Sequence, residues 1–183
     1  LTIRGTGEMA DYQAYSTPWE NNSWRIKSVV VESGVTSIGA NAFYYAQNMT
    51  TIMLPTSVTK IGAGAFSLCG ALTSITLPDS VTEIGERVFY YCEHLERAAL
   101  PGRATEIAAG MFEKCSALKN VELPASITSI GSEAFEDCSS LVQITLPARL
   151  REIGPYAFFD CSSLQTIAIP QGVTSIRYAA FSG

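Results

Sequence analysis

Five cysteines recur at one interval, and they are the residues of this sequence with the most evident capacity for chemistry. The step between neighbours is the same each time, at Cys69, Cys92, Cys115, Cys138 and Cys161. Thiols can form disulfides or bind metals, but five cannot all pair, and zinc sites favour closely spaced ligands mixed with histidine. Cysteine is also a small apolar residue that is often fully buried. We therefore expect a column of reduced, buried thiols that holds neither metal nor cofactor, with disulfides and a metal site as the alternatives.

His94 is the only histidine of the chain. General acid–base catalysis would need a nucleophile and an orienting group beside it. Glu93 and Glu96 are its nearest charged neighbours in sequence, and we expect both to be solvated. The sequence has no glycine-rich phosphate loop, metalloprotease motif or nucleophile elbow. It therefore predicts that the chain is not an enzyme.

The cysteine interval belongs to a repeat that organises most of the chain. The phrase Ile-Gly-x-x-Ala-Phe returns with the same step, and its phenylalanines are Phe43, Phe66, Phe89, Phe112, Phe135, Phe158 and Phe181. A strict period of about 23 residues is typical of a solenoid, in which each repeat forms one coil. The repeat therefore predicts one solenoid domain over residues 26–183, with seven coils, the last of them truncated.

One coil divides into three pieces. Ile75-x-Leu77 alternates with the period of a strand and ends at Pro78, which cannot donate to a sheet. The segment from Val81 to Gly85 predicts a second short strand. The apolar spacing from Val88 to Cys92 predicts one or two turns of α or 3₁₀ helix.

The coil at residues 93–110 departs from its neighbours. Ala98 and Ala104 replace larger core residues, Gly102-Arg103 replaces the usual pair ending in serine, and Ala108 replaces the glycine of the repeat. Drift of the repeat and a selected binding epitope both explain these changes.

Residues 1–25 do not follow the repeat. They include Trp19 and Trp24, and we expect them to form an N-terminal cap, because large aromatic side chains cover an open core efficiently. The chain stops within a repeat, at Phe181-Ser182-Gly183. We therefore expect a fragment of a longer protein whose open coil promotes end-to-end self-association.

Composition restricts the classes of partner. Of 183 residues, 47% are hydrophobic and 16% charged, and the net charge is −5, so a packed core is expected. Lys and Arg are scattered, which argues against nucleic acid and anionic membranes as partners. The chain has no apolar run as long as the about 18 residues of a membrane-spanning helix, so it contains no predicted transmembrane segment.

The coil Leu-x-x-Ile-x-Leu-Pro-x-Ser-Val-Thr-x-Ile-Gly-x-x-Ala-Phe-x-x-Cys resembles the BspA-like leucine-rich repeats. The resemblance covers residues 26–183, and it implies a curved, β-rich α/β leucine-rich-repeat solenoid on a secreted or cell-surface protein. Some members of this family bind host extracellular-matrix proteins or other bacteria. The general leucine-rich pattern has Asn or Cys at its ninth position. This chain instead has Ser57, Ser80, Arg103, Ser126, Arg149 and Gly172 there. No asparagine ladder can form, so the turn after the strand must satisfy its backbone in another way.

The outward positions of the first strand, on the expected concave face, are the candidate partner-binding residues. They are Thr51, Met53, Ser74, Thr76, Arg97, Asn120, Glu122, Gln143 and Thr145. Solenoids bind partners on such extended faces. We expect a protein ligand, and the resemblance adds a host matrix protein as its class. The sequence thus favours an extracellular adhesion module without catalysis, and the alternative is a passive stalk that displays other domains.

Overall fold

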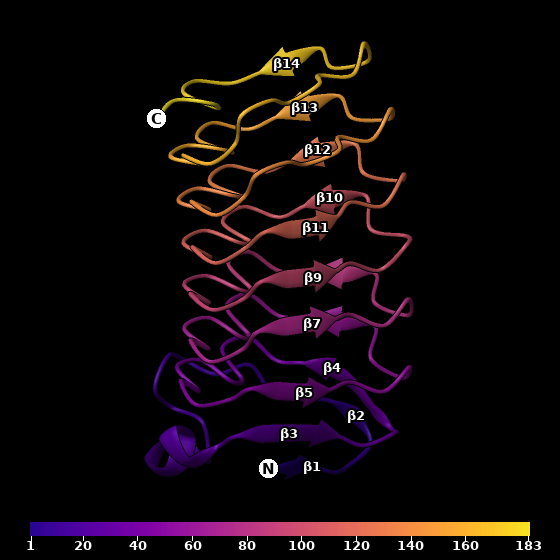
Figure 1. Ribbon diagram of the computed structural model, residues 1–183. Helices are drawn as coiled ribbons and strands as arrows, with labels where there is room; N and C mark the ends of the chain where they lie inside the picture. The colour runs from indigo at the N-terminus through magenta and orange to yellow at the C-terminus, as the bar shows by residue number, and fades with distance from the viewer.

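The computed structural model describes residues 1–183 as a stack of coils, with the N-terminus at one end and the C-terminus at the other (Figure 1). Each coil has three sides: a first strand, a second strand and a segment of turns. The stack is the solenoid that the period of the sequence predicts.

The first strands form the side that we call the strand face. Their bounds are β1 (Thr2–Ile3), β3 (Ser28–Val31) and β5 (Thr51–Met53) in one parallel sheet, and β7 (Ser74–Thr76), β9 (Arg97–Ala99) and β11 (Asn120–Glu122) in another. Pairing is coil on coil, so Ile75 lies opposite Ala98, and Ala98 opposite Val121. The central residue of each strand in this second sheet is buried, and the first residue is exposed. The predicted alternation is therefore confirmed.

The second strands form two further parallel sheets on another side of the stack. One contains β2 (Gly7–Glu8), β4 (Val35–Ile38), β6 (Lys60–Ile61) and β8 (Glu83–Ile84), and the other contains β10 (Glu106–Ile107), β12 (Ser129–Ile130), β13 (Glu152–Ile153) and β14 (Ser175–Ile176). The pairing is interrupted between β8 and β10. The interruption falls at the coil that departs from the repeat.

The third side, which we call the turn wall, corrects one prediction. It comprises residues 40–46, 63–69, 86–92, 109–115, 132–138, 155–161 and 178–181. The sequence predicts helical turns here, but Arg87 and Tyr91 have φ values of 53° and 59°, which no right-handed helix contains. Their N–H groups donate to carbonyls of the next coil, on Ala109 and Glu113. The only helix is the 3₁₀ helix η1 (Glu20–Arg25), which lies outside the repeat and is far too short to cross a membrane.

A column of phenylalanine rings runs through the core. Successive rings from Phe43 to Phe158 are stacked, with centres 5.1 to 5.8 Å apart. All of these phenylalanines are buried, whereas Phe181 in the last coil is 38% exposed. The columns that the sequence predicts to point inward thus form one continuous apolar core, and its last coil is the least covered.

Residues 1–25 extend both sides of the stack, which the sequence did not indicate. Thr2 pairs with Val30, and Gly7 with Val35, so this segment adds a strand to one sheet on each of the two strand sides. Trp19 lies on the phenylalanine column. The division into a cap and a repeat domain stays a prediction.

Candidate interaction surfaces

Most of the predicted binding residues lie where the sequence places them. Those on β5, β7, β9 and β11 are exposed on the strand face. Gln143 and Thr145 are also exposed, but they lie on no strand, which corrects the prediction for that coil. The amides of residues 142–146 donate to no backbone carbonyl, so β11 has an unpaired edge on this side.

Two adjoining hollows bring these residues together. The first, of about 240 Å³, lies across β7, β9 and β11, and Ser74, Thr76 and Arg97 line it. The second, of about 470 Å³, lies between β11 and the segment that contains Gln143 and Thr145. Asn120 and Glu122 line both hollows, whereas Thr51 and Met53 line neither. The structure therefore joins seven of the nine predicted residues into one polar groove, listed from one end as Ser74, Thr76, Arg97, Asn120, Glu122, Gln143 and Thr145.

The charges of this groove are available to a partner. Arg97 and Glu122 are exposed, and neither forms an ion pair within the chain. The neighbouring charges Lys119 and Glu96 instead pair with each other at 3.1 Å. The groove thus presents one free cation and one free carboxylate on adjacent strands.

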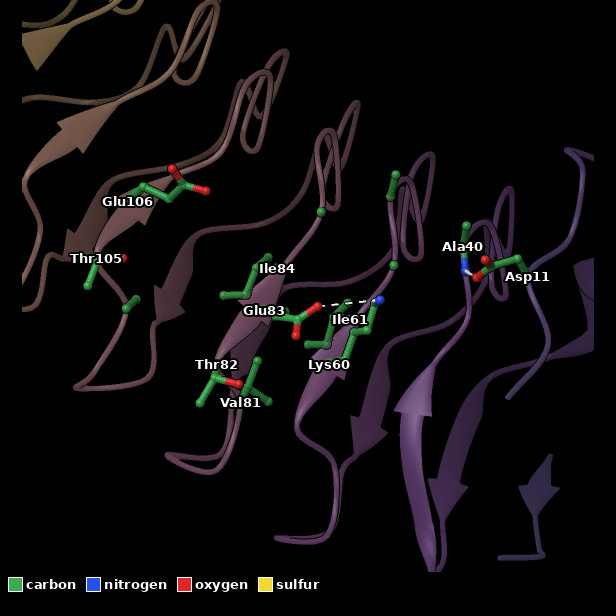
Figure 2. Close-up of a pocket in the computed structure, with 14 residues that line it drawn as sticks. Asp11, Ala40, Lys60, Ile61, Val81, Thr82, Glu83, Ile84, Thr105 and Glu106 are labelled. Atoms are coloured by element: carbon green, nitrogen blue, oxygen red, sulfur yellow. Dashed lines mark hydrogen bonds and ion pairs between the residues drawn. The ribbon is translucent and has the colours of Figure 1, made fainter. Parts of the chain in front are cut away.

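A third hollow, of about 410 Å³, lies on the side of the second strands, where β8 and β10 separate (Figure 2). Lys60 and Glu83 form an ion pair of 3.3 Å beside it, and Glu106 lines its far side. The amides of Thr105 and Ala108 donate to no backbone carbonyl, although the equivalent amides in the neighbouring coils do so. This hollow was not predicted.

Ala108 gives a physical reason for the separation. At the equivalent Gly62 and Gly85, an added Cβ would collide with the backbone nitrogen of the preceding coil. Ala108 carries that Cβ, so its coil cannot approach β8 as closely. Arg177 has the same position in the last coil and keeps its bond to Ile153, so a Cβ at this position does not by itself abolish the bond. The missing glycine at position 108 was the sequence signal nearest to this hollow.

The turn wall collects aromatic and charged side chains. Every tyrosine except Tyr12 lies on or against it: Tyr15, Tyr44, Tyr45, Tyr90, Tyr91, Tyr156 and Tyr178. Arg87 bridges Glu113 at 3.1 Å and Glu133 at 2.7 Å. Burial raises the pKa of Glu113, and the hydrogen bond from Arg87 opposes this effect. Tyrosine and arginine are enriched in protein-binding hot spots, so this wall is a second candidate surface that the sequence analysis missed.

The cysteines are buried, as predicted. All five are free and buried. Each Sγ lies 3.1 to 3.2 Å from the carbonyl of a phenylalanine in the preceding coil, to which it donates. Burial raises the pKa of Cys92 to about 12, so the reactive thiolate is disfavoured. No group of three or more His, Cys, Asp or Glu side chains is arranged to hold a metal.

His94 is exposed in a turn, and its Nδ1 lies 2.7 Å from the carbonyl oxygen of Gly70, to which it donates. Serine replaces the asparagine ladder of the general pattern. Ser80 Oγ donates to Val58 O at 2.7 Å, and Ser57 and Ser126 make the equivalent bonds. In these three coils the turn after the strand is thus tied to the preceding coil by a hydroxyl group, whereas Arg103, Arg149 and Gly172 have none to offer.

A stack of parallel strands with a constant period is a β-solenoid. Its columns of buried aliphatic residues follow the pattern of leucine-rich repeats. The family model described as "BspA type Leucine rich repeat region" matches six copies, over residues 20–141 and 105–183. The chain therefore belongs to the BspA-type leucine-rich repeat family. The fold and the family are those of repeat scaffolds, which are not generally enzymes.

Several solved structures are similar to this chain. A leucine-rich repeat protein of T. pallidum is 31% identical with a TM-score of 0.76, and the match covers 86% of this chain and 71% of that one. A leucine-rich repeat protein of Bacteroides ovatus is 28% identical with a TM-score of 0.68, covering 84% and 45%. A leucine-rich cell surface protein of Faecalibacterium prausnitzii is 31% identical with a TM-score of 0.52, covering 86% and 51%. This chain thus spans about half the length of the last two. No curated protein matches the sequence.

Proposed function

We propose that this chain is an extracellular binding module that mediates protein–protein or cell–matrix adhesion through the groove of its strand face. The observation that carries the proposal is the joining of seven exposed polar residues by two adjoining hollows. Solenoids bind partners along such extended faces. The unpaired edge of β11 adds backbone groups that an extended polypeptide segment can pair with.

A surface location is part of this proposal. It is supported by membership of the BspA-type family and by the similar structure described as a cell surface protein of Faecalibacterium prausnitzii. The class of partner proposed is a protein, with host extracellular-matrix proteins first among those to test. The chain contributes binding rather than chemistry, because its thiols are buried and its only histidine is an isolated surface residue.

The test measures saturable binding to immobilised matrix proteins such as fibronectin and fibrinogen by surface plasmon resonance. Replacing Arg97→Ala and Glu122→Ala together should weaken binding by about tenfold or more, which corresponds to about 1.4 kcal/mol. The matched control replaces Lys60→Ala and Glu83→Ala, one cation and one anion on a different side of the stack. Equal losses in both double variants would contradict the groove as the site.

The alternative function is a passive stalk that displays other domains of a larger surface protein. The regular core supports it, because a continuous phenylalanine column makes a stiff spacer. Absence of binding across a broad panel of host proteins would favour the stalk. Saturable binding that depends on Arg97 and Glu122 would exclude it.

A further inference from the structure

The middle of the turn wall shows how this chain places its own cations. The guanidinium of Arg87 lies 5.8 Å from the centre of the Tyr90 ring while it bridges two carboxylates. The ammonium of Lys114 lies 6.0 Å from the centre of the Tyr91 ring and 3.9 Å from Asp137. A cation between a tyrosine face and a carboxylate is therefore a recurrent arrangement of this wall.

The end of the wall nearest the C-terminus repeats the rings and the carboxylates without a cation. We call it the aromatic–acidic patch, and its members are Glu136, Tyr156, Phe159, Asp160 and Tyr178. Tyr156 packs edge-on against both of the other rings, with centres 5.5 and 5.6 Å apart. Tyr178 is 76% exposed. Three aromatic side chains thus offer apolar surface near Glu136, whose charge acts on Tyr156, and Asp160 directly follows Phe159 in the chain.

The carboxylates of the patch have no partner within the chain. Neither Glu136 nor Asp160 forms an ion pair. Partial burial raises the pKa of Glu136, and the neighbouring carboxylates Glu113, Glu133 and Asp137 add to this effect. The chain has no Lys or Arg between residues 152 and 176, and Arg177 pairs with Glu152 at 3.0 Å. Lys114 opposes the rise in the pKa of Glu136 only in part, so the local field is negative.

We propose that the aromatic–acidic patch binds a basic polypeptide segment, whose Arg or Lys side chains take the positions that Arg87 and Lys114 occupy further along the wall. Arginine fits best, because its planar group stacks on a ring and pairs with a carboxylate at the same time. The charge of the patch repels anionic ligands such as phosphates. This inference concerns a surface separate from the groove of the strand face and does not depend on it.

The experiment titrates the whole chain into a fluorescent peptide of alternating arginine and glycine and follows the anisotropy. One variant removes the charges, with Glu136→Gln and Asp160→Asn; asparagine suits the left-handed conformation at position 160. A second removes rings, with Phe159→Ala and Tyr178→Ala. The matched control, Glu83→Gln with Glu106→Gln, removes the same charge from another side.

Both patch variants should weaken binding by about tenfold or more, and the control by less than about twofold. Binding should also fall as salt rises, because the contact is partly ionic. Circular dichroism melts verify the fold, and Phe159→Leu with Tyr178→Leu replaces the alanine pair if that pair fails to fold. Equal losses of affinity in the charge variant and the control would overturn the proposal, because binding would then depend only on the net charge of the chain. No binding by the wild-type chain, or binding of a neutral oligosaccharide that only the ring variant loses, would overturn it as well.

Discussion

The indole ring of Trp19 stacks on the ring of Phe43, with centres 5.6 Å apart and planes inclined by 20°. Its Nε1 also donates to Ala42 O at 3.0 Å. A residue outside the repeat thus continues a column that the repeat builds. This contact is the most direct support for the proposal that residues 1–25 cap the solenoid.

Replacing Trp19→Ala should lower the free energy of unfolding by about 3 kcal/mol, because it removes a large packed ring and a hydrogen bond. Trp24→Ala is the matched control, since Trp24 is 62% exposed. It should change the free energy by less than about 0.5 kcal/mol. Urea unfolding followed by far-UV circular dichroism measures both, and equal effects would contradict the capping role of Trp19.

The buried thiols should resist modification. In the native protein we expect no rapid reaction of Cys69, Cys92, Cys115, Cys138 or Cys161 with a chromogenic disulfide reagent, whereas all five should react in denaturant. Burial blocks access of the reagent, and the raised pKa of the thiols disfavours the reactive thiolate. Fast labelling of the folded chain would show that the column is accessible.

Alkaline pH should destabilise the fold through the same residues. The pKa of Cys92 is about 12 in the folded chain and about 8.5 in the unfolded one, so only the unfolded state loses its proton between these values. Stability is therefore fully present below about pH 8.5 and is lost as pH rises towards 12, by about 1.4 kcal/mol per pH unit for this group. Replacing Cys92→Ala should reduce that slope in urea titrations. Alanine already occupies the equivalent position of the first coil, at Ala46. An unchanged slope would contradict the assignment.

Ala108 should control the separation of β8 and β10. The amides of Thr105 and Ala108 should exchange with deuterium faster than those of Thr128 and Gly131, which donate to the preceding coil. Ala108→Gly removes the obstructing Cβ and should slow exchange at Thr105. Nuclear magnetic resonance measures each amide. Unchanged exchange at Thr105 would mean that the wider differences of this coil, such as Ala104, hold the strands apart.

The last coil should promote end-to-end association of this chain. Ile169, Ile176 and Phe181 are 40%, 50% and 38% exposed, although their repeat equivalents are mostly buried. Light scattering should detect species larger than 19.7 kDa that increase with concentration. Ile176→Lys should reduce them. A strictly monomeric mass at all concentrations would count against this prediction.

The confirmed predictions concern positions at which successive coils carry the same type of residue. Cys92 was predicted to be buried because cysteine recurs at the equivalent position of neighbouring coils, and in a stack equivalent positions lie on one another. The predicted helix at residues 88–92 was wrong for a related reason. Apolar spacing of about three fits a helix, yet Arg87 and Tyr91 adopt left-handed conformations, whose cost is offset by hydrogen bonds to the next coil.

The candidate site was predicted in part. The alternation of the strand identified Arg97 and Glu122 as exposed neighbours, but the groove that joins them to Gln143 follows from the loss of pairing beyond β11. Seen from sequence, the tyrosines of the turn wall are scattered from Tyr15 to Tyr178. Only the stacking of coils brings them onto one side.

The sequence by itself determined the period, the membership of each column and hence the family, because a strict repeat allows only one register of stacking. The tertiary structure decided where the sheets are interrupted, which polar residues share a groove and which side gathers aromatic rings. These features depend on relations between coils, such as the separation of β10 from β8 and the packing of Tyr156 against Tyr178. Residues one full repeat apart in sequence become neighbours only after the chain has folded.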